Sequence, residues 1–301
     1  MLLCLTRTGQ LRRMVLEATT NMAKLKVGLA LGGGGARGLA HIGVLKVLEK
    51  RGIQIDCLAG TSIGGVIAAG YAQGMSAEEL EIEAVKFSKL RHLVSLLDPN
   101  PARRGFLEGN RVKKYLQSLF EPSQFFENLK IPLILNAVDL NTCTEIAMKE
   151  GPLLPAILGT IAVPGLFPPV AQNGHLLIDG GVLNNVPTSH IRSLGTDIVI
   201  AVDVLSDPVP ESVGGAATHR PHFPVPLPDF FIDLYRALII MSSQNTRMQL
   251  ASYPPDVLIH PDIPADITMF LGFLQVHEVI AAGEAAALQA LPQIESLLEA
   301  E

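Results

Sequence analysis

Residues 26–38 read KVGLALGGGGARG, and residues 54–64 read QIDCLAGTSIG. Each stretch is a short apolar run that leads into glycines, which is typical of a buried strand in a parallel sheet. Residues 38–51 follow the first run with apolar positions on one side, and residues 62–72 follow the second with small side chains, so a helix is expected after each. Strand, helix, strand and helix in succession predict an α/β fold with a parallel sheet.

The rest of the chain adds further predicted elements to this unit. Ser76 and Glu79 match a capping box that opens a helix to about residue 89. Further helices are expected at 109–120, 152–162, 229–251 and 276–299, and further strands at 132–140, 144–148, 175–178, 197–204 and 256–260. Residues 205–228 hold six prolines and two glycines, and we interpret them as an exposed loop or a lid-like insertion.

The domain organisation follows from the absence of a recognisable repeat or linker in the sequence. Residues 22–301 are expected to form a single domain, with a core at about 25–205 and a helical C-terminal part. Residues 1–21 lack the sustained apolar run of a signal peptide or anchor, and Met22 opens a run that looks like a natural start. We therefore interpret residues 1–21 as an extension of unknown role.

The composition limits the classes of partner. The 301 residues carry a net charge of −6, so no basic field attracts nucleic acid. Cys4, Cys57 and Cys143 are too widely spaced for a disulfide framework or a paired metal site, and a reducing, cytoplasmic compartment is expected. The histidines lack metal-ligand spacing, so neither a metal nor a cofactor is expected. Prolines interrupt the apolar stretch 156–171, and no segment is expected to span a membrane.

The first chemical motif is Gly60-Thr61-Ser62-Ile63-Gly64, which matches the G-x-S-x-G nucleophile elbow. The chemistry needs a serine on a sharp turn between a strand and a helix, where the flanking glycines let the chain pass close to itself. The N-terminus of the following helix would also stabilise negative charge beside Ser62. The alternative is a tight turn that carries an incidental serine.

The second motif is the glycine loop at 32–38, which allows two functions. Gly33, Gly35 and Gly38 satisfy the dinucleotide pattern G-x-G-x-x-G, and Asp56 lies 18 residues beyond Gly38, near where a ribose-binding acid is expected. Successive glycine N–H groups could equally form an oxyanion hole for an acyl-transfer intermediate. A phosphate-binding P-loop does not fit, because no Lys-Ser/Thr pair follows.

The third motif is Asp179-Gly180-Gly181, which follows the apolar run 176–178. An acid at the end of a strand, followed by glycines, is well placed to project into a site. The alternative is an ordinary Asp-Gly turn.

Together, these motifs resemble those of the patatin-like phospholipase family, in particular its bacterial-type members. The resemblance covers most of residues 25–205 and includes GGGGARG at 32–38, GTSIG at 60–64 and DGG at 179–181. The proline-bearing segment 161–169 and the continuation of the glycine loop at 39–45 are also similar to those members. The resemblance implies a patatin-like, three-layer α/β fold with a mostly parallel central sheet and helices on both faces.

The resemblance also implies a mechanism without histidine. Ser62 would be the nucleophile and Asp179 its base, and Gly38, Gly60, Gly64, Gly180 and Gly181 would be motif glycines. The oxyanion hole would comprise Gly33, Gly34 and Gly35, with positive charge added by Arg37. A lipid or fatty-acyl ester would be hydrolysed through an acyl-enzyme without a metal. Desolvation could raise the pKa of the carboxylate base from its ordinary value of about 4.

Two rival interpretations and one membrane hypothesis remain open. A Ser-Asp-His hydrolase would pair Ser62 with an acid such as Asp203 and with His260 or His277. A non-catalytic nucleotide-binding module is the second rival. Three other histidines are expected to be structural or supporting groups: His41, His175 and His190. Peripheral membrane contact is a hypothesis for three stretches: residues 205–228, the helix that begins at Asp229, and residues 269–274.

Overall fold

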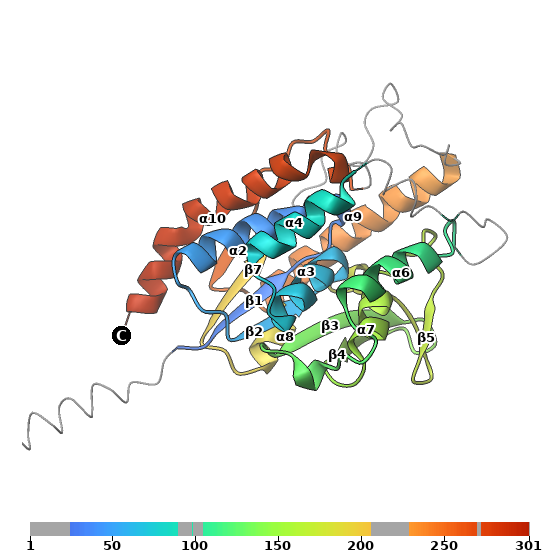
Figure 1. The fold of residues 1–301 in the computed structure, drawn as a ribbon, viewed down its shortest axis with the longest axis horizontal. Helices are drawn as coiled ribbons and strands as arrows, with labels where there is room; N and C mark the ends of the chain where they lie inside the picture. Colours follow the sequence, from blue (N-terminus) through green and yellow to red (C-terminus); the bar gives the residue numbers. More distant parts are fainter. Residues whose placement is uncertain (1–24, 90–97, 99–104, 206–228, 270–271, 301) are drawn as a thin grey trace, which may run out of the picture.

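The computed structural model describes residues 25–89, 98, 105–205, 229–269 and 272–300. In this part of the chain, eight strands form one sheet (Figure 1). The strands are β1 (Val27–Leu31), β2 (Cys57–Gly60), β3 (Leu133–Asp139), β4 (Thr144–Met148), β5 (Val170–Gln172), β6 (His175–Asp179), β7 (Ile198–Val202) and β8 (Val257–Ile259). Their order is β5-β6-β3-β2-β1-β7-β8, and β4 pairs with β3.

Helices cover both faces of this sheet. The α-helices are α2 (Ala40–Lys50), α3 (Ser62–Gln73), α4 (Ala77–Phe87), α6 (Asn110–Leu119), α7 (Leu153–Thr160), α8 (Thr188–Ser193), α9 (Asp229–Ser252) and α10 (Val276–Glu299). Short 3-10 helices are η1 (Gly35–Leu39), η2 (Phe126–Asn128), η3 (Gly180–Val182) and η4 (Gly272–Gln275). The predicted α/β class with a mostly parallel sheet between helical layers is confirmed.

The centre of the sheet is parallel, whereas one side of it is antiparallel. β3, β2, β1, β7 and β8 pair in parallel. β4, β5 and β6 pair in antiparallel fashion. Every residue of β1, β2, β3 and β7 is buried. Strands that are buried on both faces are characteristic of a parallel sheet with helices on both sides, which is why they read as continuous apolar runs in the sequence.

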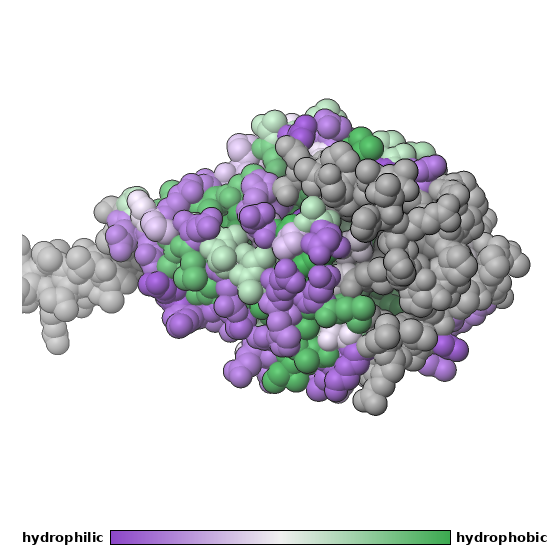
Figure 2. All heavy atoms as spheres, turned by 90° about the horizontal axis from the view of Figure 1, so that it is seen from above, coloured by the Kyte–Doolittle hydropathy of each residue, from purple (hydrophilic) through white to green (hydrophobic). Residues whose placement is uncertain are grey.

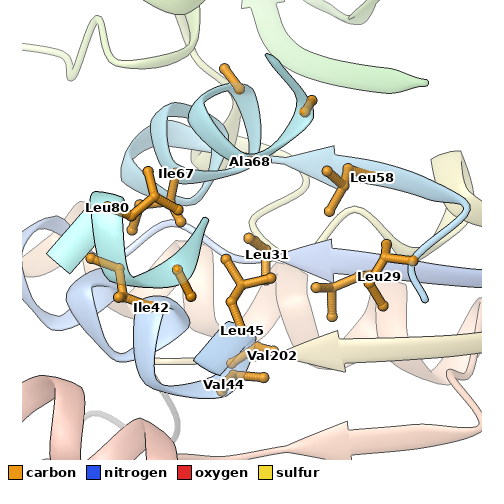
Figure 3. Close-up of a cluster of buried hydrophobic side chains, with 14 of the residues drawn as sticks. Leu29, Leu31, Ile42, Val44, Leu45, Leu58, Ile67, Ala68, Leu80 and Val202 are labelled. Carbon is orange, nitrogen blue, oxygen red and sulfur yellow. The ribbon is translucent and has the colours of Figure 1, made fainter. Parts of the chain in front are cut away.

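The two faces of the sheet carry different cores. Large side chains such as Leu29, Leu31 and Leu58 belong to one buried cluster with Ile42 and Leu45 of α2 (Figure 3). Smaller residues, including Ala30, face the other side, where α8 packs. Large and small residues alternate along β1, so its large side chains face α2 and its small ones face α8.

The C-terminal elements belong to the same layers as the N-terminal ones. β8 extends the parallel sheet beside β7, and α10 lies along α2 (Figure 1). A Cβ atom added to Gly43 would collide with the backbone of Ile280, and one added to Gly283 would collide with Ala40. The two helices therefore approach at their backbones. Seen from the α10 side, the described surface is mostly hydrophilic, with smaller hydrophobic groups between (Figure 2).

Most predicted elements lie within a few residues of the observed ones, and the capping box of Ser76 and Glu79 is present. β2 begins at Cys57, and the preceding Asp56 already bonds β1: its N–H donates to the carbonyl oxygen of Val27, and its carboxylate accepts from the N–H of Val27. β5 and α8 were not predicted, since three and six residues are too short to show a period. Residues 1–21, 206–228 and 270–271, with all of the predicted extension and all but the first residue of the predicted loop, lie outside the described residues.

Candidate active site

The strand register brings the elbow and the acid motif to the same part of the sheet. Gly60, the last residue of β2, pairs with Leu135 of β3. Asp179, the last residue of β6, pairs with Ala137, two residues further along the same edge of β3, because β4 occupies the other edge from Leu135 to Asp139. Successive residues of a strand advance by about 3.3 Å, so the ends of β2 and β6 face each other about 7 Å apart along this edge. The glycine loop follows the end of β1, which is the next neighbour of β2.

Ser62 occupies a left-handed turn between β2 and α3. Its φ is +53°, which a residue with a side chain rarely adopts. A Cβ atom added to Gly60 would lie 2.6 Å from the Cα atom of Gly65, and one added to Gly64 would lie 2.5 Å from the carbonyl oxygen of Gly32. Both glycines are therefore required by close backbone approach. This is the geometry of a nucleophile elbow.

Buried polar groups hold the turn from beneath. The N–H of Ser62 donates to Thr160 Oγ1 at 2.9 Å. The hydroxyl of Thr61 donates to Asn136 Oδ1 at 2.7 Å, and the Nδ2 atom of Asn136 donates to the carbonyl oxygen of Asn184. Sequence reasoning missed Thr160, Asn136 and Asn184. A buried asparagine in the middle of the apolar strand 132–140 was the available signal.

Asp179 is a buried carboxylate that faces Ser62. Its side chain is 6% exposed and accepts hydrogen bonds from the Ser62 hydroxyl and, at 2.8 Å, from the N–H of Gly181. Burial raises the pKa of Asp179 to about 6, and these two hydrogen bonds oppose the rise. The carboxylate is thus a stronger base than an exposed aspartate and is still largely ionised at neutral pH.

The three glycines proposed for the oxyanion hole differ in what their N–H groups do. The N–H of Gly33 donates to the carbonyl oxygen of Asn185 at 3.1 Å. The N–H groups of Gly34 and Gly35 have no acceptor among the described residues. All three residues line the same cavity as Ser62. The geometry therefore makes Gly34 and Gly35 the candidate donors, with Gly33 in a supporting position.

Arg37 has a different role from the expected one. Its buried guanidinium donates to the carbonyl oxygens of Val204, Ile263, Pro264 and Ile267, at 3.0 to 3.3 Å. It is not among the described residues that line the cavity. The prediction that Arg37 adds charge beside the oxyanion is thereby corrected: the side chain anchors the glycine loop to the chain that follows β7 and β8.

The remaining motif glycines fill positions where a side chain would not fit. A Cβ atom added to Gly180 would lie 2.6 Å from Asn136 Cγ. A Cβ atom added to Gly181 would lie 2.8 Å from Asn185 Oδ1. At Gly38 it would collide with Ile63.

The dinucleotide alternative is not supported by the position of Asp56. Its carboxylate bonds the N–H of Val27, at the start of β1, whereas the glycine loop follows the end of that strand. Five residues of strand separate the two by about 16 Å. Asp56 therefore does not face the loop as a ribose-binding acid would.

The five described histidines do not line the cavity that contains Ser62. None of His41, His175, His190, His260 and His277 is among the described residues that line the cavity. His260 Nδ1 does lie 3.9 Å from a carboxylate oxygen of Asp203, as the Ser-Asp-His alternative requires, but neither side chain reaches the cavity.

Three of these histidines have structural partners. His175 contacts Asp139 at 2.9 Å, and His190 contacts Glu145 at 2.8 Å. His41 is fully buried, its Nε2 atom donates to the carbonyl oxygen of Gly32, and burial lowers its pKa to about 4.

A cavity of about 370 Å³ extends from Ser62 and Asp179 between helices. α3 contributes Val66, Ile67 and Gly70, and α4 contributes Leu80, Ala84 and Phe87. These intervals of three and four residues mark one side of each helix. Gly70 follows Ser62 by eight residues, so the wall formed by α3 is about 12 Å long.

The far wall of the cavity contains aromatic side chains. The ring of Phe87 lies 5.1 Å from the rings of Tyr115 and Phe273. Burial, with a smaller contribution from nearby Glu83, raises the pKa of Tyr115 to about 12, so that its hydroxyl stays neutral. The wall therefore suits an uncharged, apolar guest.

This geometry agrees with a comparison against known families. A sequence model of patatin-like phospholipase matches residues 29–191, more than half of the chain. The chain belongs to the patatin-like phospholipase family. The match includes the glycine loop, the elbow around Ser62 and the segment around Asp179.

Similar family members are much longer than this chain. Lysophospholipase NTE1 of Pyricularia oryzae is 30% identical over 283 residues, which cover 89% of this chain and 18% of that protein. Patatin-like phospholipase domain-containing protein 6 of Mus musculus is 37% identical over 185 residues, covering 59% of this chain and 13% of that protein. The chain thus spans less than a fifth of the length of these relatives.

Among solved structures, VipD from Legionella pneumophila has a TM-score of 0.42 at 16% identity, covering 76% of this chain and 67% of that one. The type III effector protein ExoU has a TM-score of 0.41 at 14% identity, covering 90% and 53%.

Proposed function

We propose that the protein is a serine lipid-ester hydrolase that works through a Ser62–Asp179 dyad. The observation that carries the proposal is the hydrogen bond of the Ser62 hydroxyl to a buried Asp179 carboxylate, at one end of an apolar cavity. The fungal relative is named a lysophospholipase and the mouse relative a patatin-like phospholipase. Both names agree with a carboxylic ester of a fatty acid as the substrate class.

The proposed reaction has two steps. Ser62 Oγ attacks the ester carbonyl carbon while its proton passes to Asp179, and the N–H groups of Gly34 and Gly35 stabilise the oxyanion. The alcohol leaves with the proton from Asp179, so that an acyl-serine remains. Water then attacks the acyl-serine, again with Asp179 as base, and the fatty acid is released as the serine regains its proton.

The environment of Asp179 supports its role as a base without histidine. A pKa of about 6 lies closer to neutral pH than that of an exposed carboxylate, and proton transfer is most efficient when the pKa lies near the working pH. The N–H of Gly181 holds one carboxylate oxygen. This contact fixes the direction of the group toward Ser62.

The shape of the cavity supports a fatty acyl chain as the group that Ser62 receives. A carbon chain with bonds of about 1.5 Å and angles of about 111° advances about 1.25 Å per carbon. The roughly 12 Å between Ser62 and Gly70 along α3 would therefore take about ten carbons of an extended chain. Each buried methylene contributes about 0.8 kcal/mol to binding, which favours long chains over short ones.

The proposal is tested by following the fate of a long-chain lysophospholipid and of a matched ether lipid, which lacks the ester carbonyl. We expect fatty acid release from the ester in water labelled with ¹⁸O, with the label in the fatty acid, and an acyl group on Ser62 in rapidly quenched samples. Turnover of the ester by Ser62→Ala at the rate of the unmodified protein would contradict the proposal.

We also propose that the enzyme is cytoplasmic and meets its substrate at a membrane surface, through α9. Leu234, Met241 and Met248 are 48%, 59% and 64% exposed. Their spacing of seven residues places them on one side of the helix. Leu238 and Ser242, which neighbour this side, line the cavity. An apolar surface that continues into the cavity would let an acyl chain enter from a bilayer without crossing water.

Vesicle flotation tests this contact. Met241→Glu together with Met248→Glu is expected to reduce binding to phospholipid vesicles and hydrolysis of vesicle lipid, and to leave hydrolysis of a soluble short-chain ester unchanged. Equal binding by both proteins would contradict the role of α9.

Among the described helices, none combines the length and the apolar character that a membrane span requires.

A further inference from the structure

Asn185 makes two hydrogen bonds to the same glycine. Its carbonyl oxygen accepts from the N–H of Gly33 at 3.1 Å, and its side-chain Nδ2 atom donates to the carbonyl oxygen of Gly33 at 3.1 Å. The residue is 3% exposed and lines the cavity. Both polar groups of Gly33 are therefore fixed by a single residue from the segment that follows the acid motif.

The bond to the carbonyl oxygen of Gly33 also sets the direction of the next N–H group. The peptide that joins Gly33 to Gly34 is planar and trans, so its C=O and N–H point in opposite directions. Because the C=O points to Asn185, the N–H of Gly34 points away from it. That N–H has no acceptor among the described residues, and Gly34 lines the cavity beside Gly33.

The preceding peptide is fixed in the same way. His41 Nε2 donates to the carbonyl oxygen of Gly32 at 2.7 Å, so the N–H of Gly33 points in the opposite direction, to the carbonyl oxygen of Asn185. Two successive peptides of the glycine loop are thus held by a buried side chain on each carbonyl. A glycine has no side chain to restrict its own rotation, so such external contacts are needed to hold one orientation.

We propose that Asn185 is a positioning residue for the oxyanion hole: its amide turns the peptide after Gly33 so that the Gly34 N–H faces the ester oxygen during attack by Ser62. This inference rests on the proposed function. The side chain also connects the glycine loop to the acid motif, since Cβ atoms added to Gly33 and Gly181 would lie 2.6 Å and 2.8 Å from Asn185 Oδ1. Movement of the acid loop would therefore disturb the oxyanion hole.

The test replaces Asn185 by leucine, which has a similar shape and no donor, and in a second variant by alanine. The matched control is Thr188→Val in the same segment, which removes a part-buried hydrogen bond of 2.8 Å from the Thr188 hydroxyl to the carbonyl oxygen of Tyr253. The readouts are kcat and KM on a soluble fatty-acyl ester, and inhibition by a trifluoromethyl ketone. This ketone forms a tetrahedral oxyanion on serine. Binding of a long-chain fatty alcohol, which is uncharged and has no carbonyl oxygen to place in the oxyanion hole, is measured in parallel.

We expect Asn185→Leu to lower kcat by about 10²-fold, the usual effect of losing or misplacing one oxyanion donor. KM and fatty-alcohol binding should change by less than about threefold, because neither the ester nor the alcohol carries the transition-state charge. Inhibition by the ketone should weaken by about the same factor as kcat, since both depend on the oxyanion. Thr188→Val should change stability alone.

Two results would overturn the inference: an unchanged kcat in the Asn185 variants, or an equal loss in ketone and fatty-alcohol binding. If Asn185→Leu does not fold, the same comparison is made with Asn185→Ala: its loss in ketone binding is set against its loss in fatty-alcohol binding. An unmodified protein that neither hydrolyses esters nor reacts with the ketone would instead reject the proposed function itself, so the two failures are distinguishable.

Discussion

Replacement of Asp179 by asparagine is expected to stabilise the protein while it abolishes activity. The carboxylate is 6% exposed, and no cation is among the causes that shift its pKa. At neutral pH the folded protein therefore keeps a desolvated negative charge that the unfolded chain would expose to water. Asparagine has nearly the same shape, still accepts from the N–H of Gly181, and carries no charge.

The size of the effect follows from the pKa. Burial raises the pKa of Asp179 from 3.8 to about 6 in the folded protein. This rise corresponds to about 3 kcal/mol at neutral pH, since a tenfold change in proton affinity is about 1.36 kcal/mol. Between pH values of about 4 and 6 the folded state binds more protons than the unfolded state, so the stability of the natural protein falls as pH rises. For a chain of this length, 3 kcal/mol raises the melting temperature by about 6 °C.

The assay is thermal or denaturant unfolding of both proteins at about pH 7.5 and pH 4. We expect a stabilisation of about 3 kcal/mol at the higher pH and less than about 1 kcal/mol at the lower pH, where Asp179 is protonated. Asp203→Asn is the matched control, because Asp203 is also 6% exposed but faces the charge of Arg37. A destabilised Asp179→Asn protein, or a stabilisation independent of pH, would refute the reasoning.

Three further predictions concern the same site. The kcat/KM for a neutral ester should rise with pH through about 6, because only ionised Asp179 can accept the serine proton; a flat profile between pH values of about 5 and 7 would contradict this. The free energy of unfolding of Ser62→Gly should exceed that of Ser62→Ala by about 1 kcal/mol, since glycine adopts a φ of +53° without strain. Equal free energies of unfolding in denaturant would contradict this prediction. Gly70→Leu should reduce hydrolysis of esters longer than about ten carbons by at least about tenfold and leave shorter ones within about twofold, and a uniform loss would count against the proposed chain path.

The parallel core of the fold could be predicted because its signal is local. Buried strands such as 26–31 read as continuous apolar runs, and glycines mark their ends. The antiparallel side of the sheet was less accessible. β5 has three residues, and its pairing with β6 depends on a tight turn that positive φ at Asn173 and Gly174 makes possible. Such a short strand is defined by its partner, not by its own sequence.

The site divides in the same way. Ser62 and Asp179 could be named because each belongs to a motif with a chemical reason for its spacing. The role of Arg37 could not be predicted, since its acceptors are backbone carbonyls of Val204 and of residues more than 220 positions away in the chain. Asn185 was likewise missed. The sequence does place two adjacent asparagines, Asn184 and Asn185, in an otherwise apolar stretch after Asp179. It does not show that Asn185 bonds Gly33, which lies 152 positions earlier in the chain.

The central claim, a dyad of Ser62 and Asp179 without histidine, is tested most directly by labelling with a fluorophosphonate probe. The natural chain would be compared with Ser62→Ala, Asp179→Asn and His260→Ala. We predict that the probe labels Ser62, that labelling collapses in the first two variants, and that it persists in His260→Ala. Loss of labelling in a folded His260→Ala protein, or strong labelling of Asp179→Asn, would contradict the dyad.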